Sequence, residues 1–188
     1  YNTKIEPLKR FRPAGMIWYQ GESEIMSGFT ADEYEAQFDL LQSSYSELFG
    51  YENELMPVVY SQLASYLYSG DIPGILDFNI GLTQMQNETR ASISVYDVPL
   101  TFIPEAGSIH PENKLEFGER MADAALRLVY GEENNCIVST VKNSEVKDSS
   151  VYVTFENVGD GLAVNGDKPD GFAVCGSDGI YVKANAEI

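Results

Sequence analysis

The chain has 188 residues, of which 44% are hydrophobic and 22% are charged, a composition that is ordinary for a globular protein. Its 29 acidic residues against 12 basic ones give a formal net charge of −17, so its surface should repel nucleic acids and anionic membranes. No run of about eighteen apolar residues is present, which argues against a membrane-spanning helix. The chain opens at Tyr1 without an initiator Met or an apolar signal region, and we expect it to be cut from a longer protein.

Apolar strand-like runs alternate with helical patterns three times between residues 14 and 131. After a basic connector, the apolar runs occupy residues 14–19, 55–60 and 91–96. The helical patterns occupy residues 30–48, 75–86 and 111–130. Thr30 with Glu33 predicts a capping box on the first helix, while Pro111 predicts the start of the third and Gly131 its end. This alternation predicts a doubly wound α/β fold.

Beyond Gly131 the pattern changes to short β-prone runs separated by turn signals. The runs cover residues 136–142, 151–155, 172–175 and 180–183. We therefore expect residues 1–131 to form an α/β domain and residues 132–188 to form an antiparallel β module that is incomplete at its end. Cys136 and Cys175 are too few for a disulfide framework, and we expect unpaired core residues while leaving a pair open.

Polar residues gather after each predicted strand. Gln20 to Glu24 follow the first strand, Gln62 follows the second and Asp97 closes the third. His110, the only histidine, lies in the loop beyond. Ligands of open α/β sheets bind at the carboxyl ends of the strands, and an imidazole titrates near neutrality and can move protons. The sequence therefore predicts a site at this edge of the sheet.

Three kinds of chemistry fit these residues. A histidine, a carboxylate and a strand-end amide donor supply most of an acyl-transfer site, but neither Ser23 nor Ser108 lies in a full nucleophile-elbow motif. Glu22 and Glu24 would be the carboxylates of a glycosidase. Carbohydrate binding without catalysis is the third possibility, favoured by the aromatic side chains of Trp18 and Tyr19 and by the β module. One histidine and two distant cysteines do not predict a metal site.

Two blocks of the sequence resemble the sialate O-acetylesterases. The first is similar to the family's Trp-Tyr-Gln-Gly-Glu-Ser block and runs Gly15-Met16-Ile17-Trp18-Tyr19-Gln20-Gly21-Glu22-Ser23. The second is similar to the family's Ile-His-Pro-x-x-Lys block and runs Ser108-Ile109-His110-Pro111-Glu112-Asn113-Lys114, followed by Gly118 and Arg120. The region from Phe155 to Phe172 resembles the family's C-terminal β region. The resemblance covers nearly the whole chain.

This resemblance implies a flavodoxin-like, three-layer α/β/α sheet of the SGNH hydrolase type, without a metal or organic cofactor, that removes acetyl groups from sugars such as sialic acid. Acetylxylan esterases are relatives of this family. The resemblance makes His110 the general base and Gln20 the oxyanion donor, with the Gly21 backbone beside it. Glu22 would orient the loop or form a hydrogen bond near the histidine. Trp18 and Gln62 would contact the sugar. An extracytoplasmic location follows from the family's habit of secretion or lysosomal residence.

The sequence departs from the family pattern in two places. The family's nucleophilic serine lies in a Gly-Gln-Ser-Asn block before the first shared block, and this sequence has no such block. We therefore expect a chain that is inactive alone, with an incomplete sheet whose exposed edge could form a homo-oligomer. The family's acid stands three residues before the histidine, where this sequence has Gly107, so the acid would be Asp97 or Glu105, or the site would act as a dyad.

Overall fold

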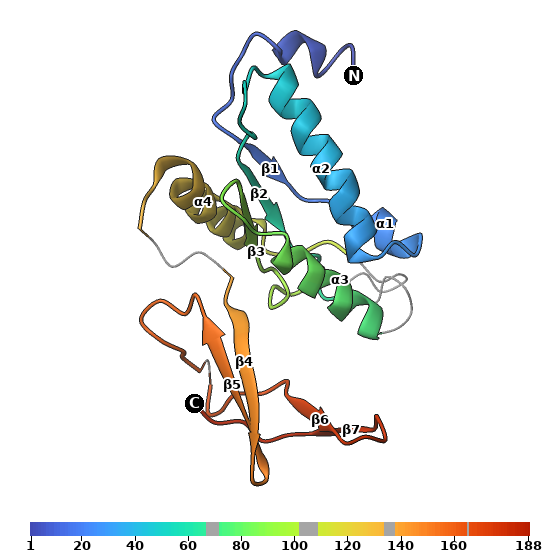
Figure 1. Cartoon of the computed structure of the whole chain (residues 1–188), viewed down its shortest axis with the longest axis vertical. Helices are drawn as coiled ribbons and strands as arrows, with labels where there is room; N and C mark the ends of the chain where they lie inside the picture. Colours follow the sequence, from blue (N-terminus) through green and yellow to red (C-terminus); the bar gives the residue numbers. More distant parts are fainter. Residues whose placement is uncertain (67–71, 102–108, 134–137, 165) are drawn as a thin grey trace. The chain divides into compact units, whose positions relative to one another are not determined.

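The computed structural model describes residues 1–66, 72–101, 109–133, 138–164 and 166–188 (Figure 1). The chain divides into two compact units, Tyr1–Thr140 and Val141–Ile188. The first unit opens with the short 3-10 helix η1 (Glu6–Leu8). Three strands follow, the first succeeded by two helices and the other two by one helix each. Among the described residues, no helix is both long and apolar enough to cross a membrane.

The first unit is built on a three-stranded parallel sheet. Its strands are β1 (Met16–Trp18), β2 (Val58–Ser61) and β3 (Arg90–Ile93), in the order β1-β2-β3. Met16 lies opposite Val58, and Val58 lies opposite Arg90 in the next pair. The three predicted strands are therefore confirmed, each shorter than its apolar run.

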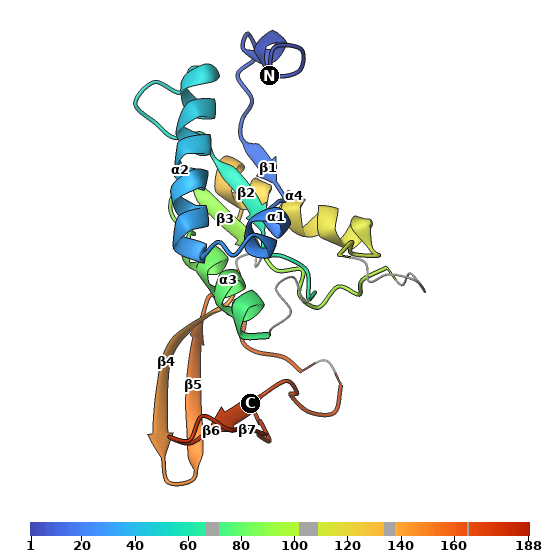
Figure 2. The same cartoon turned by 90° about the vertical axis from the view of Figure 1, so that its right-hand side faces the viewer.

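Helices cover both faces of this sheet, because successive side chains of β2 point in opposite directions. Val58 and Tyr60 pack in a first core cluster with residues of α1 (Glu22–Met26), α2 (Ala31–Leu48) and α3 (Ile72–Gln84). Val59 packs in a second cluster with Met121 and Ala124 of α4 (Lys114–Tyr130). Figure 2 shows α2 and α4 on opposite sides of the strands. The mixed α/β fold with a parallel sheet, predicted from the alternating pattern, is confirmed.

The predicted capping box begins α2. The Glu33 backbone N–H lies 3.2 Å from the Thr30 hydroxyl oxygen, and the Thr30 N–H donates to the Glu33 carboxylate at 2.9 Å. These bonds satisfy N–H groups that a helix start otherwise leaves unpaired. From this fixed start, every fourth residue faces the core, namely Tyr34, Phe38, Gln42 and Ser46.

The prediction that Pro111 starts the last helix is wrong. The helix begins at Lys114, because Asn113 is its N-cap and accepts a hydrogen bond from the Glu116 N–H at 3.1 Å. Pro111 instead pairs with Leu100 in an isolated bridge. Gly131 ends α4 as predicted, in the left-handed conformation with φ of 72°.

The short helix α1 was not predicted from the sequence. Residues 20–24 look polar and loop-like, yet Glu22–Met26 are helical, and Gly21 is the N-cap residue with φ of 143°. Two carboxylates in the first turn, Glu22 and Glu24, favour this helix because they face the positive end of its dipole. The first polar segment after β1 is therefore a turn followed by a helix.

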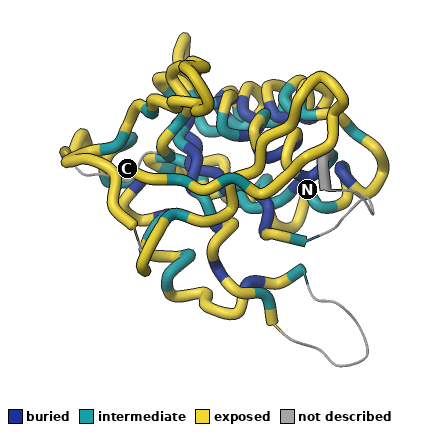
Figure 3. Tube along the Cα trace, turned by 90° about the horizontal axis from the view of Figure 1, so that it is seen from below, coloured by how far each residue is buried: buried dark blue, intermediate teal, exposed yellow. Residues whose placement is uncertain are grey.

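The second unit consists of two strand pairs. The turn at residues 148–149 joins β4 (Thr140–Lys147) to its partner β5 (Ser150–Glu156), while β6 (Ala173–Cys175) and β7 (Tyr181–Lys183) pair in antiparallel fashion. Most residues of this unit are exposed (Figure 3). Cys175 is free, as expected, but it is exposed rather than part of a core. Cys136 lies outside the described residues.

Candidate active site

The turn after β1 is held against α2 by hydrogen bonds from aromatic side chains. The indole N–H of Trp18 donates to the hydroxyl oxygen of Tyr34 at 3.2 Å. The Tyr34 hydroxyl in turn donates to the backbone carbonyl of Gln20 at 2.7 Å. Trp18 and Gln20 are half-buried, whereas Tyr34 is only 4% exposed. The two ends of the Trp18–Gln20 segment are thus fixed to one buried side chain.

The carboxamide of Gln20 has partners at both of its polar atoms. Its Nε2 donates to the carboxylate of Glu24, and its Oε1 lies 3.4 Å from the Tyr34 hydroxyl. An amide NH₂ group carries two hydrogens, and among the described residues only Glu24 accepts from it, so one N–H of Gln20 is left for a further acceptor. The arrangement can therefore present a neutral hydrogen-bond donor at the carboxyl end of β1.

Gly21 occupies a position that requires glycine. Its φ of 143° is unfavourable for residues with a side chain, and an added Cβ would lie 3.3 Å from Leu63 and 3.4 Å from Phe78. The residue is buried. Because Gly21 lies at the start of α1, its backbone N–H lies at the helix end where anionic oxygens are favoured.

His110 lies at one end of a loop whose two ends are pinned together. The Thr101 N–H donates to the His110 carbonyl at 2.9 Å, and the Glu112 N–H donates to the Pro99 carbonyl at 2.8 Å. The His110 residue is exposed, so its ring is accessible to solvent. These backbone bonds fix the place where the chain leaves the loop and enters α4.

Packing brings the histidine segment and the β1 segment to the same core cluster. Ile109, next to His110, packs against the first cluster, as do Trp18 and Tyr19. The Tyr19 ring also lies 4.8 Å from the ring of Phe117 on α4, measured between centroids. Lys114 lies over the Tyr19 ring at 5.6 Å, a cation–π contact. Burial, with the nearby Glu22 carboxylate, raises the pKa of Tyr19 to about 12.

Asp97 is bound to α4. Both of its carboxylate oxygens accept hydrogen bonds from the Arg120 guanidinium, at 2.7 and 2.8 Å. These bonds lower the pKa of Asp97. Arg120 also donates to the Ser94 carbonyl at 2.7 Å, so it links α4 to the segment after β3. The role of Asp97 as the acid beside His110 stays a prediction, and the alternative, Glu105, lies outside the described residues.

Gln62, predicted to contact the sugar, follows β2 and bonds to α3. Its Nε2 donates to the Asn79 carbonyl at 3.1 Å and to the Thr83 hydroxyl at 2.5 Å. Asn79 is buried and bonds with both polar groups of the Leu63 backbone. The amide hydrogens of Gln62 therefore tie the end of β2 to α3. Within the described part of the chain no partner is seen for its oxygen, which is the group left for a ligand.

The glycosidase interpretation took Glu22 and Glu24 as two carboxylates flanking the end of the first strand, and the structure instead places them in a helix. Both lie in α1, where residues two apart do not face each other. Glu24 is also the acceptor for Gln20. Ser23 lies between them and is exposed, and Ser108 lies outside the described residues.

The sequence does not predict the hydrogen bond from Tyr34 to the turn after β1. The helical spacing of Tyr34 with Phe38 marks it correctly as a core residue, and burial raises its pKa to about 12. A tyrosine rather than a phenylalanine at a core position was the available signal, because a buried hydroxyl needs a hydrogen-bond partner. That partner is the turn that carries Gln20.

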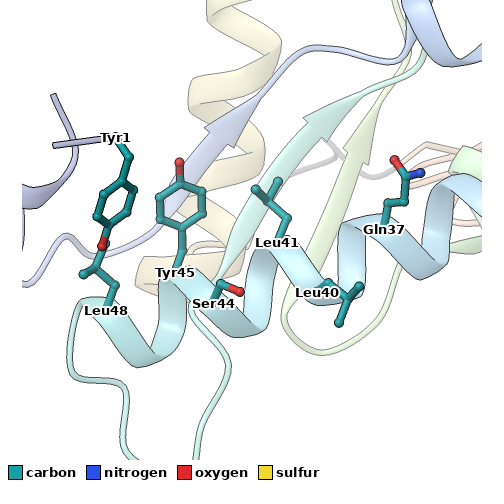
Figure 4. A pocket seen from close by; sticks show the side chains of 7 residues that line it. All are labelled: Tyr1, Gln37, Leu40, Leu41, Ser44, Tyr45 and Leu48. Atoms are coloured by element: carbon teal, nitrogen blue, oxygen red, sulfur yellow. The ribbon is translucent and has the colours of Figure 1, made fainter. Parts of the chain in front are cut away.

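A groove of about 390 Å³ lies on the other side of α2, away from these residues. Gln37, Leu41 and Tyr45 line it together with Tyr1, Leu40, Ser44 and Leu48 (Figure 4). None of the predicted site residues lines it. Among the residues that the structure describes, no group of three or more His, Cys, Asp or Glu side chains is arranged to hold a metal ion.

The sequence and the fold both resemble carbohydrate esterases. The sialate O-acetylesterase of Rattus norvegicus is 27% identical over 152 residues, covering 71% of this chain and 27% of the relative. The Homo sapiens sialate O-acetylesterase is 29% identical over 152 residues, covering 71% of this chain and 28% of the relative. The chain thus spans little more than a quarter of these relatives.

A crystal structure of a novel carbohydrate acetylesterase from Xanthomonas citri is similar to the whole of this chain. It has a TM-score of 0.78 at 25% identity and is covered over 43% of its own length. Residues 1–127 also match the family described as carbohydrate esterase, sialic acid-specific acetylesterase. That match includes the β1 turn, the histidine loop and most of α4. The chain therefore belongs to the sialic acid-specific acetylesterase family of carbohydrate esterases.

Proposed function

We propose that this chain supplies the proton-transfer and oxyanion-binding half of a carbohydrate O-acetylesterase site. The serine nucleophile would come from outside these 188 residues, because the sequence lacks the Gly-Gln-Ser-Asn block that the family's serine occupies. The chain alone would then be inactive. The observation that carries the proposal is the Gln20 carboxamide at the end of β1, bonded to Tyr34 and Glu24.

The reaction would be ordinary serine-ester hydrolysis. The serine oxygen attacks the acetyl carbonyl while His110 takes the hydroxyl proton, and the carbonyl oxygen becomes an oxyanion. His110 then gives the proton to the leaving sugar oxygen, leaving an acetyl-enzyme and a free sugar hydroxyl. A water molecule, deprotonated by His110, attacks the acetyl-enzyme, which releases acetate and restores the serine.

Two donors would stabilise the oxyanion in both steps. The N–H of Gln20 that does not bond to Glu24 and the backbone N–H of Gly21 would be these donors, and a donor of this kind contributes about a hundredfold to a thousandfold to the rate. Glu22 would orient this turn from the first residue of α1. Trp18 and the oxygen of Gln62 would contact the sugar.

The substrate would be an O-acetylated sugar, and acetylated sialic acid is the first one to test. Support comes from the names of the mammalian relatives, sialate O-acetylesterases, and from the description of the family. An acetylxylan substrate is the second possibility, since the Xanthomonas citri neighbour is described only as a carbohydrate acetylesterase.

Hydrolysis of a chromogenic acetyl ester tests this proposal. The 188-residue chain should show no turnover, whereas a form extended at its N-terminus by the serine-bearing segment of a relative should be active. His110→Ala should abolish that activity. Turnover by the 188 residues alone would place the nucleophile inside this chain, with Ser23 and Ser108 the first to mutate.

A carbohydrate-binding protein without catalysis is the alternative from another functional class. Binding of the acetylated sugar without turnover by a folded, extended form would support this alternative and contradict the proposed esterase. Circular dichroism and a cooperative thermal transition of the extended form show whether it is folded.

A further inference from the structure

We propose that Tyr34 and Glu24 are positioning residues for Gln20. Tyr34 fixes the backbone of Gln20, and Glu24 orients its carboxamide by holding one N–H of Nε2, so that the other N–H is presented to the oxyanion. This inference rests on the proposed function, and it identifies two residues outside the donor pair that the reaction would depend on.

The groups around the Tyr34 hydroxyl determine which of them accepts its hydrogen. Trp18 has an indole N–H that can only donate, so the Tyr34 oxygen is the acceptor in their 3.2 Å contact. The single hydroxyl hydrogen of Tyr34 is then available for the Gln20 carbonyl, 2.7 Å away. Because burial raises its pKa to about 12, Tyr34 stays a protonated donor at every pH where an ester hydrolase would be assayed.

The packing of Tyr34 makes this anchor rigid. The side chain lies in the first core cluster, with its ring centroid 5.3 Å from that of Phe78 and 6.1 Å from that of Phe38. Because residues of α2 and α3 hold the Tyr34 side chain in place, its hydroxyl is a fixed hydrogen-bond partner for the Gln20 turn.

The Glu24 carboxylate also selects one of the two possible orientations of the Gln20 amide. As observed, Nε2 faces the Glu24 carboxylate and Oε1 faces the Tyr34 hydroxyl. A flipped amide would place Oε1 against the Glu24 carboxylate, where two acceptors face each other without a hydrogen between them. Glu24 therefore disfavours the flipped orientation of the Gln20 amide, which would withdraw the N–H donor from the oxyanion.

Four variants separate positioning from a general loss of stability. Tyr34→Phe removes only the hydroxyl and keeps the ring in the core. Tyr60→Phe is the matched control, because Tyr60 lies in the same cluster and donates its hydroxyl to the Leu82 carbonyl, away from Gln20. Glu24→Ala removes the acceptor for Gln20, and Glu24→Gln keeps an acceptor oxygen of similar reach.

The orientation is measured first on the 188-residue chain, by NMR of the Gln20 side-chain amide, assigned by loss of its signals in Gln20→Leu. We expect two well-separated proton shifts with slow exchange in the wild type. Tyr34→Phe and Glu24→Ala should move these shifts toward those of free glutamine, and Tyr60→Phe should not. Averaged, fast-exchanging amide protons in the wild type would overturn the proposal.

Kinetics of the extended form on the acetyl ester measure the consequence. Tyr34→Phe should lower kcat about tenfold with KM little changed, since Tyr34 acts only through a donor worth about a hundredfold or more. Glu24→Ala should act similarly, and Glu24→Gln should recover most of the loss. An unchanged kcat in Tyr34→Phe, or an equal loss in Tyr60→Phe, would overturn the inference while leaving the esterase proposal intact. An inactive but folded extended form with an ordered Gln20 amide would overturn the esterase instead.

Discussion

Arg120 on α4 forms an ion pair with Asp97 in the segment after β3. This ion pair makes the stability of the folded protein depend on pH. Hydrogen bonds from Arg120 lower the pKa of Asp97 from its usual 3.8. A carboxyl with a lower pKa in the folded state adds stability above its unfolded pKa, and this addition is lost as the pH falls through the folded value. The stabilising effect of the pair is therefore complete near neutrality and absent in strong acid.

We expect Asp97→Asn to lower the melting temperature at pH 7, and the difference from the wild type to shrink as the pH falls below 3.8 and through the lowered pKa of Asp97. Thermal unfolding from pH 7 to pH 2.5 measures this. The exposed Glu119 on α4 provides the control, since Glu119→Gln removes one negative charge from a chain of net charge −17 without affecting the pair. A melting-temperature difference that is constant across pH would contradict the prediction.

Helices α2 and α3 meet at a position where one methyl group matters. A Cβ added at Gly81 on α3 would lie 2.1 Å from the Cβ of Ala31 on α2, so the helices would have to separate. At Gly118 on α4 no atom lies within 4 Å of an added Cβ, and the residue is exposed. A glycine-to-alanine substitution is therefore expected to destabilise the protein at Gly81 in α3 and to stabilise it at Gly118 in α4.

We predict that Gly81→Ala lowers the free energy of unfolding by about 1–3 kcal/mol, the usual cost of overpacking. Gly118→Ala should raise it by about 1 kcal/mol, because alanine favours an exposed helix interior over glycine. Urea unfolding of both variants gives the comparison. Stabilisation by Gly81→Ala would mean that α2 and α3 are not in close contact at this point.

The sequence predicted those elements that are determined by local pattern. The α2 helix followed from its capping box and four-residue spacing, and the strands followed from their apolar runs. The start of α4 was misplaced because Pro111 and Asn113 both favour helix starts, and hydrogen bonding by Asn113 decided between them. Helix α1 was missed because five residues are too few to show a helical period.

The sequence predicted the residues of the candidate site, but it did not predict the contacts that these residues make. Gln20 and His110 follow from their place after strands and from the shared family blocks. The bond from Tyr34 to Gln20 joins residues fourteen positions apart, and it exists only because α2 packs on the sheet. The commitment of the Gln62 amide to α3 likewise depends on how β2 and α3 meet, which no local pattern encodes.

The buried apolar core belongs to one of the two units of the molecule. Every buried hydrophobic residue of the described core lies within Tyr1–Thr140, and the last is Ala124. The second unit, Val141–Ile188, consists of strand pairs whose residues are mostly exposed. Hydrophobic burial, which drives folding, is therefore concentrated in the first unit.

We expect a chain that ends at Thr140 to unfold cooperatively on its own. Its melting temperature should lie within about 3 °C of the main transition of the 188-residue chain, a difference of roughly 1 kcal/mol for a domain of this size. Differential scanning calorimetry of both chains measures this. Loss of a cooperative transition in the shorter chain would show that residues 141–188 complete the fold of the first unit.

Tyr34 belongs at once to the core cluster and to the bond that holds Gln20. If Tyr34 positions Gln20 as proposed, selection for catalytic turnover also acts on the packing of α2, because α2 carries Tyr34. Random mutagenesis scored by activity should recover core positions of α2 as often as the turn itself. Substitutions that stabilise the core should therefore leave α2 in place, because a change that shifts α2 would also move the Gln20 amide.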